Sequence, residues 1–181
     1  MRLVQDTEAV LIATAALINT EDRERLPDPA ALEEFVQKWG WTGRHDHSRA
    51  ELRAVQTLRS RLRRVWAASE DEAVEIINGL LCDYGASPRL VRHEQTYQLY
   101  ATPSHERLAG RMAVAAAMAF AKLVTNGELS RLRVCEYPGC DDVVVDLSRN
   151  RSRRFCDAGC GNRSSVAAYR ARKAALRRQQ Q

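Results

Sequence analysis

The sequence lacks the apolar run of roughly 18 residues that a transmembrane helix requires. It also has no nucleophile motif, no glycine-rich phosphate loop and no convergent pair of carboxylates. The longest apolar stretch, at 112–124, is alanine-rich and is interrupted by Lys122, and Asp6 and Glu8 precede any apolar core that a signal peptide would need. We therefore expect a cytoplasmic protein that does not enter a membrane and is not an enzyme.

Acidic residues are scarce at the C-terminal end of the chain, although they slightly outnumber basic residues in the rest. Residues 131–181 hold 12 Lys and Arg against 5 Asp and Glu, whereas residues 1–130 hold 16 against 18. The C-terminal part therefore has a net charge of +7 and the rest of −2, which sum to the +5 of the whole chain. Such a local positive field favours a polyanionic partner such as nucleic acid, although a solvated basic tail has the same composition.

Helix signals recur through the first 130 residues. Residues typical of helix N-termini stand at Asp28 with Pro29, Ser48 with Glu51, and Ser69 with Glu72. Apolar spacing and the capping residues predict helices over 7–18, 29–39, 48–68, 70–84 and 104–124, whereas the alternation within 88–102 predicts a short β-hairpin. These elements predict a helical N-terminal domain over residues 1–130.

Several side chains of this domain match weaker functional patterns. His45 and His47 around Asp46 suggest a metal pair, but a polar loop before a helix is more typical of solvent-exposed histidines. Cys82 is expected to be a buried thiol. A solvated helix face is the favoured interpretation of Arg53, Arg59, Arg61, Arg63 and Arg64. An ordinary core is the favoured interpretation of five aromatic residues, although an effector pocket or a dimer face would also accommodate them: Trp39, Trp41, Trp66, Tyr97 and Tyr100.

Four of the five cysteines lie within 26 residues. Four residues separate the first two, three separate the last two, and fifteen separate the pairs, in the order Cys135, Cys140, Cys156 and Cys160. Because tetrahedral zinc is bound by four thiolates supplied as two close pairs, the spacing predicts one structural Zn²⁺ ion. Pro138 and Gly139 allow a tight turn within the first pair, residues 143–155 predict a second β-hairpin, and Cys160 is expected at a helix start. Residues 131–181 therefore predict a treble-clef-like finger.

Other chemistry of four cysteines fits the sequence less well. Two disulfides would require an oxidising compartment, which nothing in the chain indicates. A thioredoxin-type pair has two residues between its cysteines, unlike either pair here. A redox-switchable zinc thiolate and an iron–sulfur cluster stay as alternatives.

Two basic segments flank the last two cysteines. Residues 164–178 contain no proline and are rich in Ala, Arg and Lys, which predicts a helix. One face of that helix carries Arg163, Arg170, Lys173 and Arg177, and the preceding turn carries Arg149, Arg151, Arg153 and Arg154. Such a face can follow a phosphate backbone or read guanine in the major groove of DNA. Tyr169 and Leu176 at its margin are predicted to anchor the helix to the finger.

The residues CGNR at 160–163, with DLSRNRSRRFC before them and AAYRARK after them, resemble the CGNR zinc finger of bacterial proteins. In that family the finger follows an ABATE domain, whose pattern is similar to LINT, VQKWG and LRAVQTLRSRLRRVW in this chain. The resemblance implies a stress-induced transcriptional regulator that binds DNA, with the four clustered cysteines as zinc ligands. The last cysteine pair often has one more intervening residue in the family than the DAG found here, and Phe155 stands where Trp is frequent.

Three residues of the CGNR motif suggest hypotheses about their local roles. Gly161 would relieve crowding beside the metal, Asn162 would hydrogen-bond a thiolate or cap the helix, and Arg163 would reach a phosphate or fix the hairpin.

The sequence as a whole predicts a mainly α protein with a small β-hairpin, in which a helical domain precedes a zinc finger that ends in a basic helix. The predicted function is that of a DNA-binding transcriptional regulator, in which residues 1–130 sense a small-molecule effector or form a homodimer. The alternative is an interaction module whose finger is a structural clip and whose basic helix binds RNA or a protein.

Overall fold

The computed structural model describes residues 7–22, 24–93, 95–157 and 159–179, so the expectation that rests on Asp6 lies outside the described residues. The described elements are, in chain order, α1 (Thr7–Asn19), α2 (Pro29–Trp39), α3 (Arg49–Arg63), the 3₁₀ turn η1 (Arg64–Ala67), α4 (Glu70–Asp83), β1 (Arg89–His93), β2 (Thr96–Tyr100), α5 (Leu108–Thr125), the 3₁₀ turn η2 (Leu129–Arg131), β3 (Leu132–Val134), β4 (Val143–Val145) and α6 (Cys160–Gln179). β1 pairs antiparallel with β2, and β3 pairs antiparallel with β4. The predicted fold class is confirmed.

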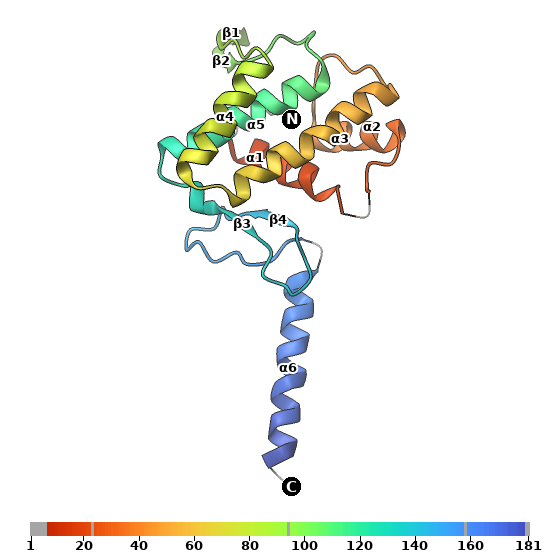
Figure 1. Ribbon diagram of the computed structural model, residues 1–181, viewed down its shortest axis with the longest axis vertical. Helices are drawn as coiled ribbons and strands as arrows, with labels where there is room; N and C mark the ends of the chain where they lie inside the picture. The colour runs from red at the N-terminus through yellow and green to blue at the C-terminus, as the bar shows by residue number, and fades with distance from the viewer. Residues whose placement is uncertain (1–6, 23, 94, 158, 180–181) are drawn as a thin grey trace.

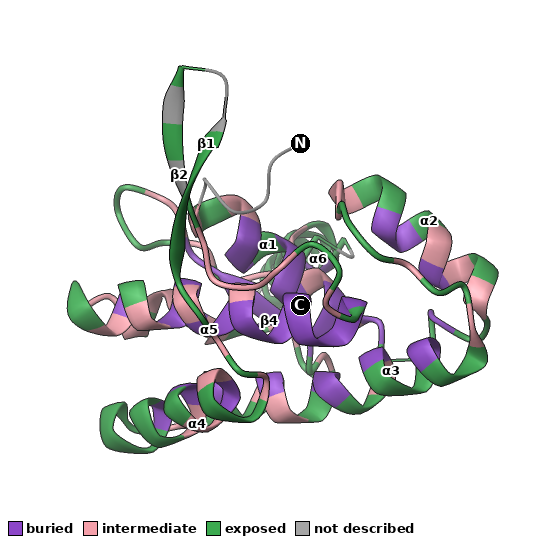
Figure 2. Ribbon diagram, turned by 90° about the horizontal axis from the view of Figure 1, so that it is seen from above, coloured by how far each residue is buried: buried purple, intermediate pink, exposed green. Residues whose placement is uncertain are grey.

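Helix α5 is the centre of the helical body, the part of the molecule formed by α1 to α5. It packs against α1, α3 and α4, and its many buried alanines let these helices approach closely. The buried residues concentrate on α1 and α5, whereas the outer face of α4 is exposed (Figure 2). By length and by its mean hydropathy of 1.4, α5 would pass as a membrane span, but 67% of it is buried inside the protein, as in the core helix of a globular fold.

The helix ends follow the capping residues with two differences. Asp28 accepts a hydrogen bond from the Ala31 amide at 2.9 Å, and Ser69 forms a reciprocal capping box with Glu72. Ser48 caps α3, but the carboxylate of Glu51 turns away from it toward the preceding loop. The predicted helix start at Ser104 is wrong, because its carbonyl accepts from the Arg44 amide at 2.9 Å and is held outside the helix, which begins at Leu108.

Arg59 and Cys82 of the helical body contradict the sequence-based expectation. Arg59 is not on the solvated face of α3, since it is only 5% exposed and its guanidinium donates to both carboxylate oxygens of Glu24 at 2.8 Å. This contact lowers the pKa of Glu24 below its usual value. Cys82, expected to be buried, is exposed. The burial of Arg59 was missed because its partner Glu24 lies 35 positions away in the chain, so the helical period does not reveal it.

Strand β4 joins the helical body to the C-terminal part of the chain, although it is only three residues long. Its alternate side chains enter two different cores: Val143 and Val145 pack into the core of the helical body, and Val144 packs beside the cysteines. The indole of Trp66, whose ring meets Phe120 edge-on at 5.4 Å, donates to the Val144 carbonyl at 3.1 Å.

Asn19, the last residue of α1, supplies the other edge of this strand. Its side-chain amide donates to the Val143 carbonyl at 2.9 Å, and its side-chain oxygen accepts from the Val143 amide at 2.7 Å. A single side chain thus pairs with the strand as a neighbouring backbone would. Figure 1 shows the result, in which β3 and β4 lie directly beneath the helical body, α6 extends away from it, and the β1–β2 hairpin stands at the opposite end.

We expect Asn19→Ala to lower the free energy of unfolding by about 2 kcal/mol, because both backbone polar groups of the buried Val143 lose their side-chain partner. Urea denaturation followed by circular dichroism measures the change. Asn126→Ala at the C-terminal cap of α5 is the matched control and should cost much less, since the cap is formed there by the backbone N–H. Equal losses in the two variants would contradict the role assigned to Asn19.

Candidate metal centre

The four clustered cysteines come from three segments: the β3–β4 connection, which holds Cys135 and Cys140, the loop after β4, and the start of α6. Cys135 follows β3, Cys140 lies shortly before β4, Cys156 lies in the loop after β4, and Cys160 is the first residue of α6. The predicted hairpin within 143–155 is wrong, because β4 pairs with β3 and residues 146–155 form a loop. The β3–β4 hairpin therefore encloses the first cysteine pair, and helix α6 begins at the second.

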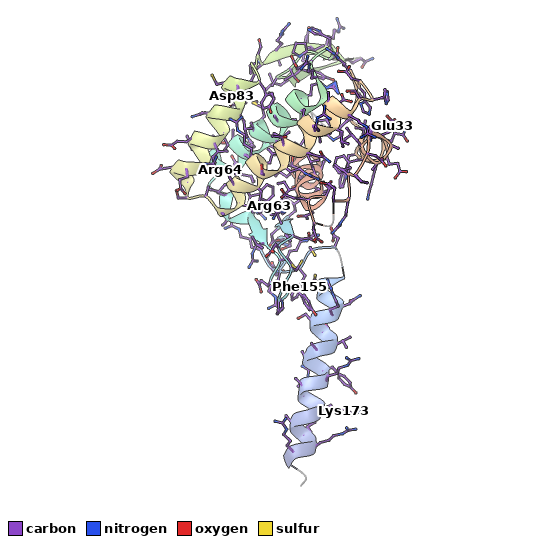
Figure 3. All side chains as sticks on the ribbon, turned by 45° about the vertical axis from the view of Figure 1, so that its right-hand side comes forward. Glu33, Arg63, Arg64, Asp83, Phe155 and Lys173 are labelled. Atoms are coloured by element: carbon purple, nitrogen blue, oxygen red, sulfur yellow. The ribbon has the colours of Figure 1, made fainter. Side chains whose placement is uncertain are left out.

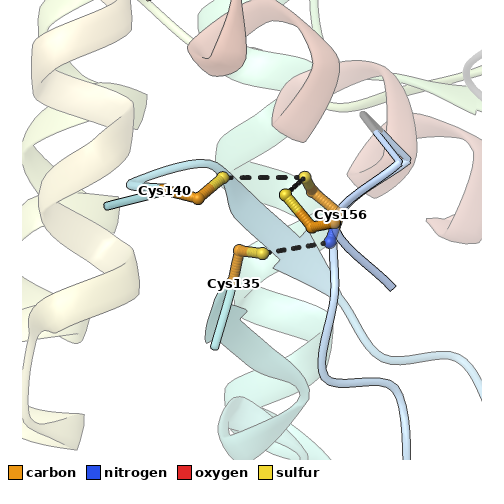
Figure 4. A group of neighbouring side chains, drawn as sticks. Cys135, Cys140 and Cys156 are labelled. Carbon is orange, nitrogen blue, oxygen red and sulfur yellow. Dashed lines mark hydrogen bonds between the residues drawn. The ribbon is translucent and has the colours of Figure 1, made fainter. Parts of the chain in front are cut away.

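The four sulfur atoms converge on one point. All lie within 4.8 Å of one another, with 3.7 Å between Cys140 Sγ and Cys156 Sγ and 3.5 Å between Cys156 Sγ and Cys160 Sγ. Figure 4 shows the side chains of Cys140 and Cys156 pointing toward each other, and the Cys156 amide directed at Cys135 Sγ at 3.4 Å. Sulfurs bound at 2.3 Å to a tetrahedral zinc lie about 3.8 Å apart, so the observed spacing fits this ion.

The turns that bring the cysteines together need glycine at two positions. Gly139, between the first pair, has a φ of 75°, and Gly159, directly before Cys160, has a φ of 78°. These left-handed conformations strain any residue with a Cβ. Gly161 does not have the predicted role of relieving crowding, because a Cβ there would lie 3.6 Å from the Phe155 ring, an ordinary contact.

The protein environment does not favour all four thiolates equally. Burial raises the pKa of the Cys140 thiol to about 11. Burial also acts on Cys160, but hydrogen bonds from the neighbouring thiols and from Arg163 outweigh it and lower the pKa of Cys160 below its usual value. Since zinc binds thiolates, its uptake must release the remaining thiol protons, and zinc affinity falls as the pH is lowered.

Arg163 of the CGNR motif acts within the finger. Its Nη2 donates to Cys160 Sγ at 2.9 Å, and its guanidinium lies 4.7 Å from the centre of the Tyr137 ring. It thereby supports a ligand and ties α6 to the turn of the first cysteine pair. Asn162 is exposed, and no described contact joins its side chain to a thiol.

The loop of residues 146–155 is organised around one buried carboxylate. Asp146 is fully buried and accepts hydrogen bonds from the amide and hydroxyl of Ser148 at 3.0 and 2.5 Å and from the Arg153 amide at 3.0 Å. Burial raises its pKa, but these bonds outweigh burial and hold the pKa of Asp146 below the usual value. The loop that presents the basic turn is therefore fixed by an ionised side chain.

The basic residues predicted to contact nucleic acid lie in the 146–155 loop, where several form ion pairs, and on α6, where they are exposed. In the loop, Arg151 pairs with Glu128 at 2.9 Å, Arg153 with Asp157 at 2.6 Å and Arg154 with Glu136 at 3.6 Å. Arg149, Arg151 and Arg154 are exposed, and Arg153 is half-buried. On α6 the exposed members are Arg163, Arg170, Lys173 and Arg177. The predicted anchoring of α6 by Tyr169 and Leu176 is wrong, since these side chains are 58% and 59% exposed.

The convergent thiols on a β-hairpin and a helix start, three of them buried, define the protein as a zinc-finger protein with an N-terminal helical domain. The site fits one structural zinc ion held by Cys135, Cys140, Cys156 and Cys160. Two family models match: "CGNR zinc finger" over residues 131–173, and ABATE, described as "Putative stress-induced transcription regulator", over residues 11–127. The chain belongs to the ABATE family and carries its CGNR zinc finger. A comparison with curated proteins finds no match.

We expect Cys160→Ser to weaken the thiolate-to-metal charge-transfer absorption of protein loaded with Co²⁺, because at most three thiolates remain, and to lower the helical content, because the missing ligand also starts α6. Cys82→Ser is the matched control, since its exposed thiol lies outside the cluster. Absorption and circular dichroism of both variants measure the effect. Retention of the full charge-transfer band in Cys160→Ser would exclude the four-thiolate centre.

Proposed function

We propose that the protein is a cytoplasmic, non-catalytic transcriptional regulator that binds DNA through α6, with the 146–155 loop as a second contact. The observation that carries the proposal is the exposure of α6. All described side chains between 165 and 178 are exposed, and Lys173 points into solvent far from the rest of the molecule (Figure 3). The helix holds six Lys and Arg and no Asp or Glu.

An exposed helix of this kind is expected to gain stability from a binding partner. Helices without a tertiary partner are marginally stable in water, and α6 buries almost nothing against the helical body. Its 20 residues span about 30 Å, close to one turn of the DNA double helix. Phosphates neutralise the repulsion among its basic side chains, so a nucleic acid is the partner that its charge favours.

The loop arginines support the same partner to a lesser degree. Glu128 and Asp157 partly neutralise the positive charge of Arg151 and Arg153 through ion pairs. Arg163 is engaged with Cys160, which favours a positioning role over a direct phosphate contact. We therefore assign the main contact to Arg170, Lys173 and Arg177.

We expect the double variant Arg170→Gln/Arg177→Gln to weaken DNA binding and to reduce the slope of log affinity against log salt by about 2, one for each lost phosphate contact. The matched control is Arg53→Gln/Arg64→Gln, which removes the same charge from exposed positions on the helical body. Fluorescence anisotropy with the promoter region of the protein's own gene, over a range of salt concentrations, measures both quantities.

Other outcomes of this experiment distinguish the proposed function from its alternatives. Equal losses in the two double variants would contradict α6 as the DNA contact. Salt-sensitive binding without a protected site in a footprint would favour general nucleic-acid binding, and preference for RNA would favour the interaction module. A homodimer stays a prediction, and the number of protected half-sites reports on it.

A cavity between the helical body and the finger supports the effector part of the proposal. It has a volume of about 430 Å³, within the range of small-molecule sites, and its walls include Ile12 and Phe35 from the helical body and Val144 and Cys156 from the finger. Of the aromatic side chains predicted to form a pocket, Trp39 lines this cavity. Trp66 lies in the core, and Tyr97 is 68% exposed on the β1–β2 hairpin.

A ligand in this cavity would contact the segment that carries a zinc ligand, and we propose that it would thereby act on the orientation of α6. We expect a metabolite panel to contain a compound that raises the melting temperature of the full chain and of Val74→Trp, but not of Ile12→Trp, which fills the cavity. Val74 is the matched control because it is 37% exposed and Ile12 is 38% exposed. A broad panel without any stabilising compound would contradict an effector at this cavity.

A further inference from the structure

Three ligand-type side chains of the helical body meet far from the zinc finger. Glu33 lies on α2, and His45 and His47 lie in the connection from α2 to α3. Glu33 Oε2 is 3.0 Å from His45 Nε2 and 2.9 Å from His47 Nδ1, and these three atoms all lie within 4.8 Å of one another. Figure 3 shows Glu33 on the side of the body away from Phe155 and the start of α6.

The exposure of the two histidines corrects the expectation from the sequence. The His47 side chain is 63% exposed, as expected for a polar loop, but that of His45 is only 10% exposed. The two rings stack with their centres 4.0 Å apart, so both present a nitrogen to the same carboxylate oxygen.

The atoms of this cluster face one another without completing a hydrogen bond. Glu33 Oε2 and His45 Nε2 are both buried, and neither has a hydrogen-bond partner, although only 3.0 Å separates them. Buried polar atoms almost always have a partner. The pair is therefore close but misaligned, as expected when both atoms direct lone pairs at a third atom. Ligands bound at about 2.0 Å to a tetrahedral ion lie about 3.3 Å apart, close to the observed separations.

A second carboxylate holds His45 in the tautomer that a metal needs. His45 Nδ1 lies 2.6 Å from Glu51 Oε2, and Glu51 is only 6% exposed. A proton on Nδ1 donated to this carboxylate leaves the Nε2 lone pair free to bind an ion, the arrangement found around metal-bound histidines. The other ligand is fixed in the same way, because Glu33 Oε1 accepts a hydrogen bond from Gln37 at 2.6 Å.

The loop that carries the histidines is held in place on two sides. Glu51 accepts the amides of Asp46 and His47 at 3.0 and 3.1 Å, and Arg111 of α5 donates to the Arg44 carbonyl at 2.8 Å. His47 has a φ of 49°, a left-handed conformation that costs free energy in a residue other than glycine. The surroundings therefore impose a strained backbone that turns the His47 ring toward Glu33.

We propose that Glu33, His45 and His47 form a second metal site that binds a divalent first-row transition-metal ion such as Zn²⁺. Two imidazoles and one carboxylate select such ions over Mg²⁺ and Ca²⁺, which prefer oxygen ligands. Three protein ligands leave a fourth position for water or an incoming ligand, and the exposed His47 provides the route of entry. The ion would connect α2 to the start of α3, so it would stabilise the helical body independently of the finger and of any DNA contact.

Titration of the full chain, with its finger already filled with zinc, tests this site. With Co²⁺ as the probe in isothermal titration calorimetry, the wild type should bind one further ion whose absorption lacks a thiolate charge-transfer band. His47→Ala and Glu33→Gln should each weaken this binding at least tenfold and leave the finger ion in place. His105→Ala, at an exposed histidine outside the cluster, is the matched control and should bind as the wild type.

The exposed position of His47 and the equal size of glutamine at Glu33 make both variants compatible with folding, and circular dichroism checks this. No further Co²⁺ bound by the wild type, or unchanged binding in both cluster variants, would overturn the site and leave an ion-pair network in its place. Displacement of Co²⁺ by millimolar Mg²⁺ would overturn the assignment to a transition-metal ion.

Discussion

The sharing of strand β4 between two cores is the constraint on which the arrangement of the molecule depends. Val143 and Val145 are buried in the helical body and Val144 beside the zinc-binding cysteines, so neither core is complete without the strand. Asn19 and Trp66 bind its backbone from the helical body, and β3 pairs with it in the finger. The finger is therefore a continuation of the body's packing, in contrast to a module on a flexible linker.

A small finger of this kind has few apolar contacts of its own, and the metal and its surroundings replace them. Binding of a structural zinc supplies folding free energy on the order of 10 kcal/mol in comparable peptides. Arg163 and Asp146 complete the structure with charge: the former supports the Cys160 thiolate, and the latter organises the loop before Cys156. The CGNR signature is thus explained by metal support at its first and last residues, with Gly159 providing the turn that precedes them.

The features that the sequence predicted correctly are those encoded over short distances. Caps at Asp28 and Ser69 and the two cysteine pairs involve residues a few positions apart, so their spacing determines their geometry. Pairings between distant residues were missed, because nothing in the local pattern identifies the partner. Burial of Arg59 depends on Glu24, and the position of the His45 ring depends on Glu33 of the preceding helix. The partner of β4 was also missed, although its apolar run was recognised, because β3 and the residues before Cys156 are about equally close to it in the sequence.

The start of α6 at a zinc ligand gives the finger a mechanical property. Cys160 is both the last thiolate and the first residue of a helix about 30 Å long that projects from the molecule (Figure 1). A change of about 10° in its direction at the metal would move the far end by about 5 Å, more than the rise between adjacent base pairs. Because α6 begins at a metal ligand, any displacement of Cys160 that changed the direction of the helix would be larger at its far end than at the metal.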